Sequence, residues 1–295
     1  MSKKGKLKEL VILSGKGGTG KTTLTAAFAA LAPSLVLADC DVDAADLHLI
    51  MSPTVLQTDD FIEGKEAIVE RSLCTGCGLC SEVCRFDAFI EESDGTYSID
   101  PVRCEGCGVC VRVCPETAIK FEDRYCGKWM ISDTRFGTMV HARLEAAGEN
   151  SGLLVTLVRK EARRIALEQE KDLLLVDGPP GIGCPVISSV TGADAVVLIT
   201  EPSVSGLHDL ERVATLAKNF GIPVFVCVNK ADIDLKMTEA IKQRAIDSKN
   251  HFVGTIPYDE AMVQAQMHAL SAIEFITGET RDRIEQIWEQ IWKVM

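Results

Sequence analysis

The first group of residues in this sequence that could do chemistry is a glycine-rich run near its start. Residues 15–22 read Gly-Lys-Gly-Gly-Thr-Gly-Lys-Thr and fit the pattern G-x-x-x-x-G-K-[ST]. Glycines let successive backbone N–H groups turn inward around phosphate oxygens, and a following helix N-terminus adds partial positive charge. Lys21 is expected to reach the β- and γ-phosphates of a nucleotide, and the Thr22 hydroxyl to bind Mg²⁺. The residues expected to surround the nucleotide here are Gly15, Lys16, Gly17, Gly18, Thr19, Gly20, Lys21, Thr22 and Thr23. A glycine-rich turn without nucleotide is the alternative.

The second group consists of cysteines, because nine of the 12 fall between Cys74 and Cys126. Two runs, thirty residues apart, share the spacing C-x2-C-x2-C-x3-C. This spacing is typical of two-cluster iron–sulfur proteins, in which the fourth cysteine of each run ligates the other cluster. Structural zinc is the alternative, and two complete copies of this spacing fit a [4Fe–4S] cubane better. We therefore expect one cluster at Cys74, Cys77, Cys80 and Cys114, and the other at Cys104, Cys107, Cys110 and Cys84.

Charge and hydropathy exclude several classes of protein. The chain has 295 residues, with 31 Lys and Arg against 43 Asp and Glu, so its formal net charge is −12. This charge argues against nucleic acid or an anionic membrane surface as the main partner. The apolar run at residues 10–13 is too short for a signal-peptide core, and no run of roughly 18 apolar residues is present to span a membrane. We expect a cytoplasmic protein whose thiols stay reduced and available to metal.

Outside the cysteine-rich stretch, short β-branched runs alternate with longer helical patterns. This alternation predicts an α/β fold with a mostly parallel sheet covered by helices on both faces. Ligands of such sheets bind at the carboxyl ends of the strands, which is where the glycine-rich run lies. The expected strands are residues 10–13, 35–38, 173–176, 195–199, 224–228 and 252–254. The expected helices are residues 21–31, 154–169, 206–220, 237–248 and 284–294.

Residues 57–126 break the alternation and are expected to form a small inserted α+β domain. They hold 15 acidic and 7 basic residues, a net charge of −8, so most of the negative charge of the chain lies there. The expected organisation is a nucleotide-binding domain built from residues 1–56 and 127–295, interrupted by a two-cluster domain at residues 57–126. The acidic insert is the expected docking face for a basic redox partner.

Lys16 is a second lysine inside the glycine-rich run and is not required by the simple phosphate-binding pattern. With it, the run resembles the phosphate loop (P-loop) of the ATPases with a deviant Walker A motif. In that family the additional lysine reaches across a dimer interface to the nucleotide of the partner. The resemblance therefore implies an ATP-sandwich homodimer in which Lys16 acts in trans, in the manner of an arginine finger. The alternative is a solvated lysine with no special role.

The same resemblance implies roles for polar residues that follow other strands. Asp41 would be the first-switch residue that positions the attacking water, with Asp39 the second choice and a candidate near Mg²⁺. Asp177 resembles the second-switch aspartate that holds Mg²⁺ through water. Asn229 and Pro257 would recognise the base. N-K-x-D segments such as residues 229–232 also occur in proteins that bind guanine nucleotides. The expectation of ATP therefore rests on the rest of the family pattern.

The resemblance covers essentially the whole chain. It looks like a MinD/Mrp-type P-loop ATPase with an inserted two-cluster domain similar to bacterial ferredoxins, and it is more distantly similar to the nitrogenase iron protein. The resemblance implies an ATPase whose cycle controls electron transfer through two [4Fe–4S] clusters to a partner protein or metallocofactor. Two alternatives stay open: a carrier or assembly factor in which a cluster is cargo, and an ATP-controlled interaction switch with structural clusters.

Three features outside these motifs leave further hypotheses open. Cys184 lies seven residues after Asp177, the offset of a cluster-ligating cysteine in the nitrogenase iron protein. It would either touch a third metal site at a subunit interface or be a small buried residue beside the switch. Cys126 is interpreted as a spare thiol. The apolar stripe at residues 284–292 is expected to pack on the sheet or on a partner, because glutamates occupy the polar face that membrane-binding helices fill with Lys and Arg.

Overall fold

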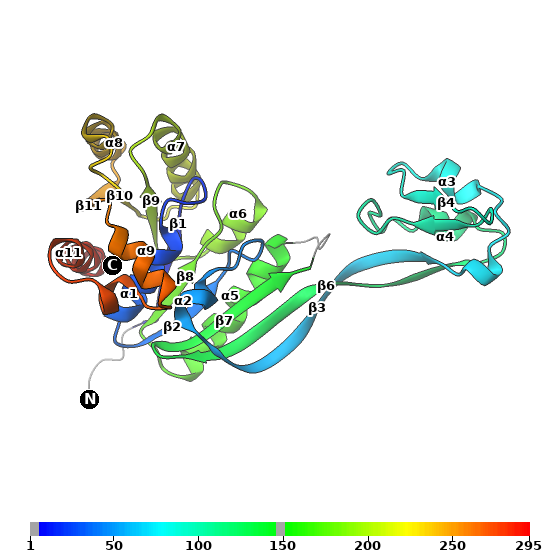
Figure 1. The fold of residues 1–295 in the computed structure, drawn as a ribbon, viewed down its shortest axis with the longest axis horizontal. Coiled ribbons are helices and arrows are strands. Elements are labelled where there is room, and N and C mark those ends of the chain that lie inside the picture. The colour runs from blue at the N-terminus through cyan, green and yellow to red at the C-terminus, as the bar shows by residue number, and fades with distance from the viewer. Residues whose placement is uncertain (1–5, 146–150) are drawn as a thin grey trace. The chain divides into compact units, whose positions relative to one another are not determined.

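The computed structural model describes residues 6–145 and 151–295, and Figure 1 shows its fold. The chain divides into two compact units. The sheet unit comprises residues 6–59, 129–143 and 151–295, and the cysteine unit comprises residues 60–128 with 144–145. The main segment of the cysteine unit thus begins three residues after residue 57, the expected start of the insert, and ends two residues after residue 126, its expected end.

A nine-stranded sheet organises the sheet unit, with the strand order β11-β10-β9-β1-β8-β2-β7-β6-β3. Strand β1 pairs in parallel with both β8 and β9, and parallel pairing continues to β10 and β11 on one side and to β2 and β7 on the other. The prediction of an α/β fold with a mostly parallel sheet is therefore confirmed. The strands are β1 (Lys8–Leu13), β2 (Leu35–Asp39), β3 (Thr54–Val69), β6 (Ile119–Thr134), β7 (Gly137–Leu144), β8 (Leu173–Asp177), β9 (Ala195–Thr200), β10 (Val224–Asn229) and β11 (His251–Ile256).

Helices connect and cover these strands. The helix that follows the glycine-rich run is rich in Ala and Leu and ends just before Pro33, because a residue that precedes proline is disfavoured in helical conformation. The C-terminal apolar stripe packs in the core, where the Trp288 ring stacks on Phe28 with centroids 5.3 Å apart. The helices are α1 (Lys21–Leu31), α2 (Leu47–Met51), α5 (Ser151–Glu168), α6 (Cys184–Val190), α7 (Val204–Asn219), α8 (Leu235–Asp247), α9 (Glu260–Met267), α10 (Ala272–Phe275) and α11 (Glu279–Val294).

Three strands at one edge of the sheet are absent from the sequence-based prediction. β3 and β6, sixteen residues each, begin in one unit and end in the other, and β7 follows β6 after the two residues Arg135 and Phe136. β3 is largely exposed, and charged residues interrupt its apolar ones, so it shows neither a buried run nor a clean alternation. Its strand conformation is decided by its β6 neighbour in the sheet.

The cysteine unit is built from two similar halves. Each contains a five-residue helix that follows a left-handed glycine, and residues 89–91 and 97–99 pair as an antiparallel ribbon. Its buried core combines Cys80, Cys104 and Cys110 with the apolar side chains of Ala67, Ala88 and Ile119. The elements are η1 (Arg71–Leu73), α3 (Leu79–Val83), β4 (Phe89–Glu91), β5 (Tyr97–Ile99) and α4 (Val109–Val113).

A buried histidine gives the sheet unit an expected pH dependence. His141 on β7 is 6% exposed and its Nε2 lies 2.8 Å from the Ser132 hydroxyl. Burial and then the nearby His48 lower the pKa of His141 from 6.5 to about 4. In this pH range His141 therefore binds a proton in the unfolded chain but stays neutral in the folded chain. Its contribution to the free energy of unfolding is complete above pH 6.5 and is lost progressively as the pH falls towards 4.

We expect the free energy of unfolding of the sheet unit to fall by up to about 3 kcal/mol from this residue as pH drops from 6.5 to 4. Urea titrations at steps of pH between 6.5 and 5, before most carboxylates titrate, measure the slope of the free energy of unfolding against pH. His141→Gln should flatten it, whereas His208→Gln, at an exposed ring, should not. An unchanged slope in His141→Gln would contradict this assignment.

Candidate functional site

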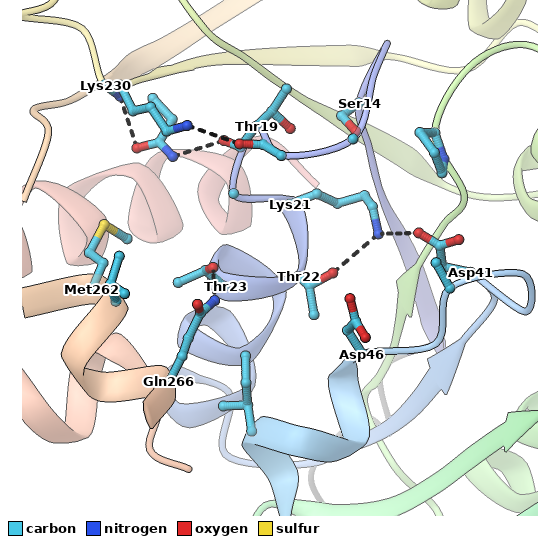
Figure 2. Close-up of a pocket in the computed structure, with 18 of the residues that line it drawn as sticks. Ser14, Thr19, Lys21, Thr22, Thr23, Asp41, Asp46, Lys230, Met262 and Gln266 are labelled. Atoms are coloured by element: carbon cyan, nitrogen blue, oxygen red, sulfur yellow. Dashed lines mark hydrogen bonds and ion pairs between the residues drawn. The ribbon is translucent and has the colours of Figure 1, made fainter. Parts of the chain in front are cut away.

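A cavity of about 510 Å³ opens at the carboxyl ends of the central strands (Figure 2). The glycine-rich run and the start of α1 form its floor, and α2 and α9 contribute further side chains. Its lining residues include Ser14, Gly17, Gly18, Thr19, Gly20, Lys21, Thr22, Thr23, Asp41, Asp46, Leu49, Ile50, Pro180, Asn229, Lys230, Pro257, Tyr258, Met262, Val263 and Gln266.

The backbone of the glycine-rich run has the shape that phosphate binding needs. Gly20 has φ +91°, in the left-handed region, and an added Cβ there would lie 2.4 Å from the Asn229 amide nitrogen. Helix α1 begins at the next residue, so its free N–H groups face the cavity floor. The buried Thr19 hydroxyl has no hydrogen-bond partner. A polar loop with an unsatisfied hydroxyl at a helix N-terminus fits a bound nucleotide phosphate.

Lys21 lies at the centre of an ionic network on the cavity floor. Its Nζ is 3.0 Å from Asp177 Oδ1 and 3.3 Å from Asp41 Oδ2. Asp177 also accepts hydrogen bonds from the hydroxyls of Thr22, at 2.8 Å, and Thr25, at 2.9 Å. The structure thus brings Lys21, Thr22, Asp41 and Asp177 together from three separate chain segments. In Figure 2, Lys21 points across the cavity floor towards Asp41.

Burial and charge shift the pKa values in this network. Burial alone would lower the pKa of Lys21, but the carboxylates of Asp177, Asp41 and Asp39 raise it above the usual value. Burial raises the pKa of Asp41, with Lys21 opposing and Asp177 adding to the shift. Lys21 is therefore firmly protonated, as a lysine that neutralises phosphate must be.

Asp39 lies outside the cavity lining. It is fully buried, and its two carboxylate oxygens accept hydrogen bonds from the backbone N–H groups of Asp41 and Leu47, at 3.2 and 3.3 Å. Burial and the neighbouring Asp177 raise its pKa well above the usual range. These contacts shape the segment that carries Asp41. Asp46, the exposed residue directly before α2, also lines the cavity.

The base-recognition candidates lie in the cavity, although the Asn229 amide is already engaged. Its Nδ2 donates to the Thr19 carbonyl at 2.8 Å, and its Oδ1 accepts from the Lys230 N–H at 3.0 Å. Asn229 thus holds the phosphate loop in place here. Helix α9, which the sequence analysis missed, adds Met262 and Gln266 to the lining. Only three of its eight residues are strongly apolar, so no clear helical period marks it.

Lys16 points away from the nucleotide cavity. Its Nζ is 2.5 Å from Glu201 Oε1 and 3.3 Å from the Ser205 hydroxyl, both near the start of α7. Lys230 lies 3.6 Å from the other Glu201 oxygen. The hydrogen bond from Lys16, with the charges of Lys16 and Lys230, holds the pKa of Glu201 below its usual value, although burial acts in the opposite direction. In the single chain, Lys16 is therefore held by its own Glu201.

The cysteines of the two runs line two small cavities in the cysteine unit. One cavity is lined by Cys74, Cys77, Cys80 and Cys114, with Tyr97 beside them. The other is lined by Cys84, Cys104, Cys107 and Cys110, with Phe86 and Phe89 beside them. Each cavity thus takes three cysteines from one run and the fourth from the other.

Around both thiol-lined cavities, backbone segments approach each other closely. Gly76 and Gly106 occupy equivalent places in the two runs, with φ +70° and +60°. A Cβ would meet a backbone oxygen at 2.2 Å at Gly76 and at 2.1 Å at Gly106, so only glycine fits. The Ala118 N–H donates to the Cys114 Sγ at 3.3 Å. In the described part of the chain, no three His, Cys, Asp or Glu residues are placed to hold a single metal ion. The thiols of a cubane, in contrast, bind separate iron atoms.

The remaining cysteines lie elsewhere. Cys184 is exposed at the start of α6, which excludes its interpretation as a buried residue. Cys126 is buried on β6, lines neither thiol cavity, and donates from Sγ to the Glu63 carbonyl at 3.4 Å. Cys40 and Cys227 are fully buried.

A parallel sheet, a glycine-rich turn into a helix, and a lysine paired with strand-end aspartates define a P-loop nucleotide-binding protein. A family model described as the CobQ/CobB/MinD/ParA nucleotide binding domain matches residues 10–272. The chain belongs to this family, which places it among the MinD- and ParA-type ATPases.

Individual relatives agree with this assignment. An uncharacterized protein of Methanocaldococcus jannaschii is 32% identical over 232 residues, covering 77% of this chain and 79% of the relative. A second uncharacterized protein of the same organism is 26% identical over 286 residues, covering 94% and 95%. The structure of the septum site-determining protein MinD of Pyrococcus horikoshii with Mg-ADP has a TM-score of 0.59 at 17% identity, covering 98% of this chain and 97% of that one.

Among residues 6–145 and 151–295, no helix has both the length and the apolar character needed to cross a membrane.

Proposed function

We propose that this protein is an ATP-driven dimer switch that controls electron transfer through two [4Fe–4S] clusters held in a ferredoxin-like insert. The observation that carries the proposal is the division of eight cysteines between two cavities, four to each, with the fourth cysteine exchanged between runs. That exchange is the ligand arrangement of two-cluster ferredoxins. When bound, such clusters supply one-electron transfer. The acidic insert favours a partner with a basic surface.

The nucleotide part of the proposal rests on the floor of the large cavity. Lys21 would exchange its contacts with Asp41 and Asp177 for phosphate oxygens. Thr22 and Asp177 would hold Mg²⁺, directly and through water respectively. Asp41, released from Lys21, would then be free to orient the attacking water. ATP binding would thus rearrange the contacts of four residues that the structure joins in one network.

The dimer part of the proposal rests on Lys16. Its present partner, Glu201, keeps it within its own chain, so a role in trans requires that this contact break. Both side chains are partly exposed, Lys16 by 36%, and such surface pairs contribute at most about 1 kcal/mol. The contact therefore opposes dimerisation weakly and is readily exchanged for a phosphate of the partner.

Glu201→Gln is expected to raise the ATP-dependent dimer association constant by up to about fivefold for each of the two protomers, because the substitution releases Lys16 and keeps the lysine charge. Sedimentation velocity with ATP and Mg²⁺ measures the dimer fraction. Glu239→Gln removes a comparable surface contact, to Lys242 on α8, and serves as the control. A lower dimer fraction in Glu201→Gln would show that Glu201 supports the dimer rather than opposing it.

The proposed electron-transfer function is tested by anaerobic purification, iron counting and redox titration with and without nucleotide. We expect about eight iron atoms per chain and a midpoint potential that moves when Mg-ATP is added. Clusters whose potentials ignore nucleotide would contradict control by ATP, and clusters that are redox-silent would indicate a structural role.

Cluster delivery is a second candidate, because one cysteine of each cavity, Cys77 or Cys107, is exposed to solvent. An exposed ligand is open to attack by a thiol of an acceptor protein. Incubation with a chelator and an apo-ferredoxin separates the two functions. Transfer of iron to the acceptor supports delivery, whereas full retention supports electron transfer.

A further inference from the structure

The guanidinium of Arg135 joins several separate chain segments in the sheet unit. Arg135 lies in the two-residue connection between β6 and β7. Its Nη1 donates to the carbonyls of Ile50, at 2.9 Å, and Met51, at 3.1 Å. Its Nη2 donates to the Ala269 carbonyl at 3.1 Å, and Nε and Nη2 form a bidentate pair with Glu274, both at 2.7 Å.

The carbonyls that Arg135 holds belong to the end of α2 and to the segment that follows α9, both beside the nucleotide cavity. Ile50 and Met51 are the last residues of α2, and Ile50 itself lines the cavity. Ala269 lies two residues after α9, which contributes Met262 and Gln266 to the lining. A single side chain therefore contacts both the C-terminal end of α2 and the turn that follows α9, although it does not line the cavity itself.

The same residue adjoins the two strands that lead to the cysteine unit. β6 ends at Thr134, directly before Arg135. β3 begins at Thr54, three residues after the Met51 carbonyl that Arg135 holds. Both strands begin in one unit and end in the other. The hydrogen bonds of Arg135 therefore connect the end of α2 and the turn after α9 to the residues next to the ends of β3 and β6.

We propose that Arg135 is a positioning residue that couples the nucleotide cavity to β3 and β6, and through them to the cysteine sites. This inference rests on the proposed function and identifies Arg135 as the residue that transmits the effect of nucleotide. Arginine suits the role because its planar fork donates in several fixed directions at once, and its bidentate pair with Glu274 fixes its orientation. Lysine would keep the charge but not this geometry.

Hydrogen–deuterium exchange of the cluster-loaded protein, with and without AMPPNP and Mg²⁺ under anaerobic conditions, tests this inference. In the unchanged protein, nucleotide should alter exchange in residues 54–69 and 119–134. Arg135→Ala and Arg135→Lys should both lose this nucleotide-dependent difference while still binding AMPPNP. Glu274→Gln, which keeps the carbonyl contacts of Arg135, should lose only part of it.

Arg283→Ala is the matched control, because Arg283 also pairs with a glutamate, Glu279, and a backbone carbonyl, that of Thr255, but at α11 and β11. It should keep the difference. A merely structural role of Arg135 would change exchange equally with and without nucleotide, so a preserved difference in Arg135→Lys would overturn the inference. No difference in the unchanged protein would also overturn it. An unchanged cluster potential with nucleotide would instead contradict the proposed function.

Discussion

Lys21→Ala is expected to lower kcat for ATP hydrolysis by about 10²–10³-fold, the usual cost of removing one preorganised group that stabilises transition-state charge. Lys21 is the cation on the floor of the cavity that is held jointly by Asp41 and Asp177. Without it, the charge that develops on the transferred phosphoryl group loses the cation of the cavity floor. Phosphate release at saturating Mg-ATP measures the effect.

The Lys21 variant also leaves two buried carboxylates without a cation, so its folding must be checked. Asp177 keeps hydrogen bonds from Thr22 and Thr25, which argues for a folded protein. Lys21→Gln, which retains a donor at the same place, provides a second test if alanine is unstable. Lys242→Ala, at an exposed lysine of α8, should hydrolyse ATP at the original rate. A loss smaller than about tenfold in Lys21→Gln would exclude Lys21 from charge stabilisation.

Double cysteine substitutions should remove either one cluster or both, depending on whether the two cysteines line the same cavity or different cavities. Cys77 and Cys114 line one cavity, so the double variant Cys77→Ser, Cys114→Ser should keep the other cluster and about four of eight iron atoms. Cys107 and Cys114 line different cavities, so Cys107→Ser, Cys114→Ser should lose nearly all iron. Anaerobic iron counting after reconstitution distinguishes the two outcomes.

Each double variant serves as the control for the other, because both contain Cys114→Ser and differ only in the second substitution. Cys126→Ser, at a buried thiol outside both cavities, should keep all the iron. If the Cys107 pair kept four iron atoms and the Cys77 pair kept none, each cluster would draw its ligands from a single run. Equal iron in the two double variants would mean that the cavities do not hold separate clusters.

Much of the sheet unit follows from local sequence. Helix α1 spans the expected residues 21–31, and the central strands begin and end within two residues of their β-branched runs. Buried parallel strands are continuous apolar runs that need no partner to be recognised. Helix α11 begins five residues earlier than expected, because its first turn carries Glu279 and Asp282, which suit a helix N-terminus but break the apolar period.

The sequence by itself determined the chemistry of short segments. One is a phosphate loop whose glycines permit its backbone conformation, and the other is a set of eight cysteines at a spacing suited to cubanes. Both depend on neighbours a few residues apart. Only the tertiary structure decided that Asp46 lines the cavity while Asp39 holds backbone amides. It likewise decided that Glu201 holds Lys16, and that Arg135 joins α2, α9 and the strand β6. These contacts link residues that chain folding alone brings together, and an exposed charged side chain carries no local signal of the partner it will meet.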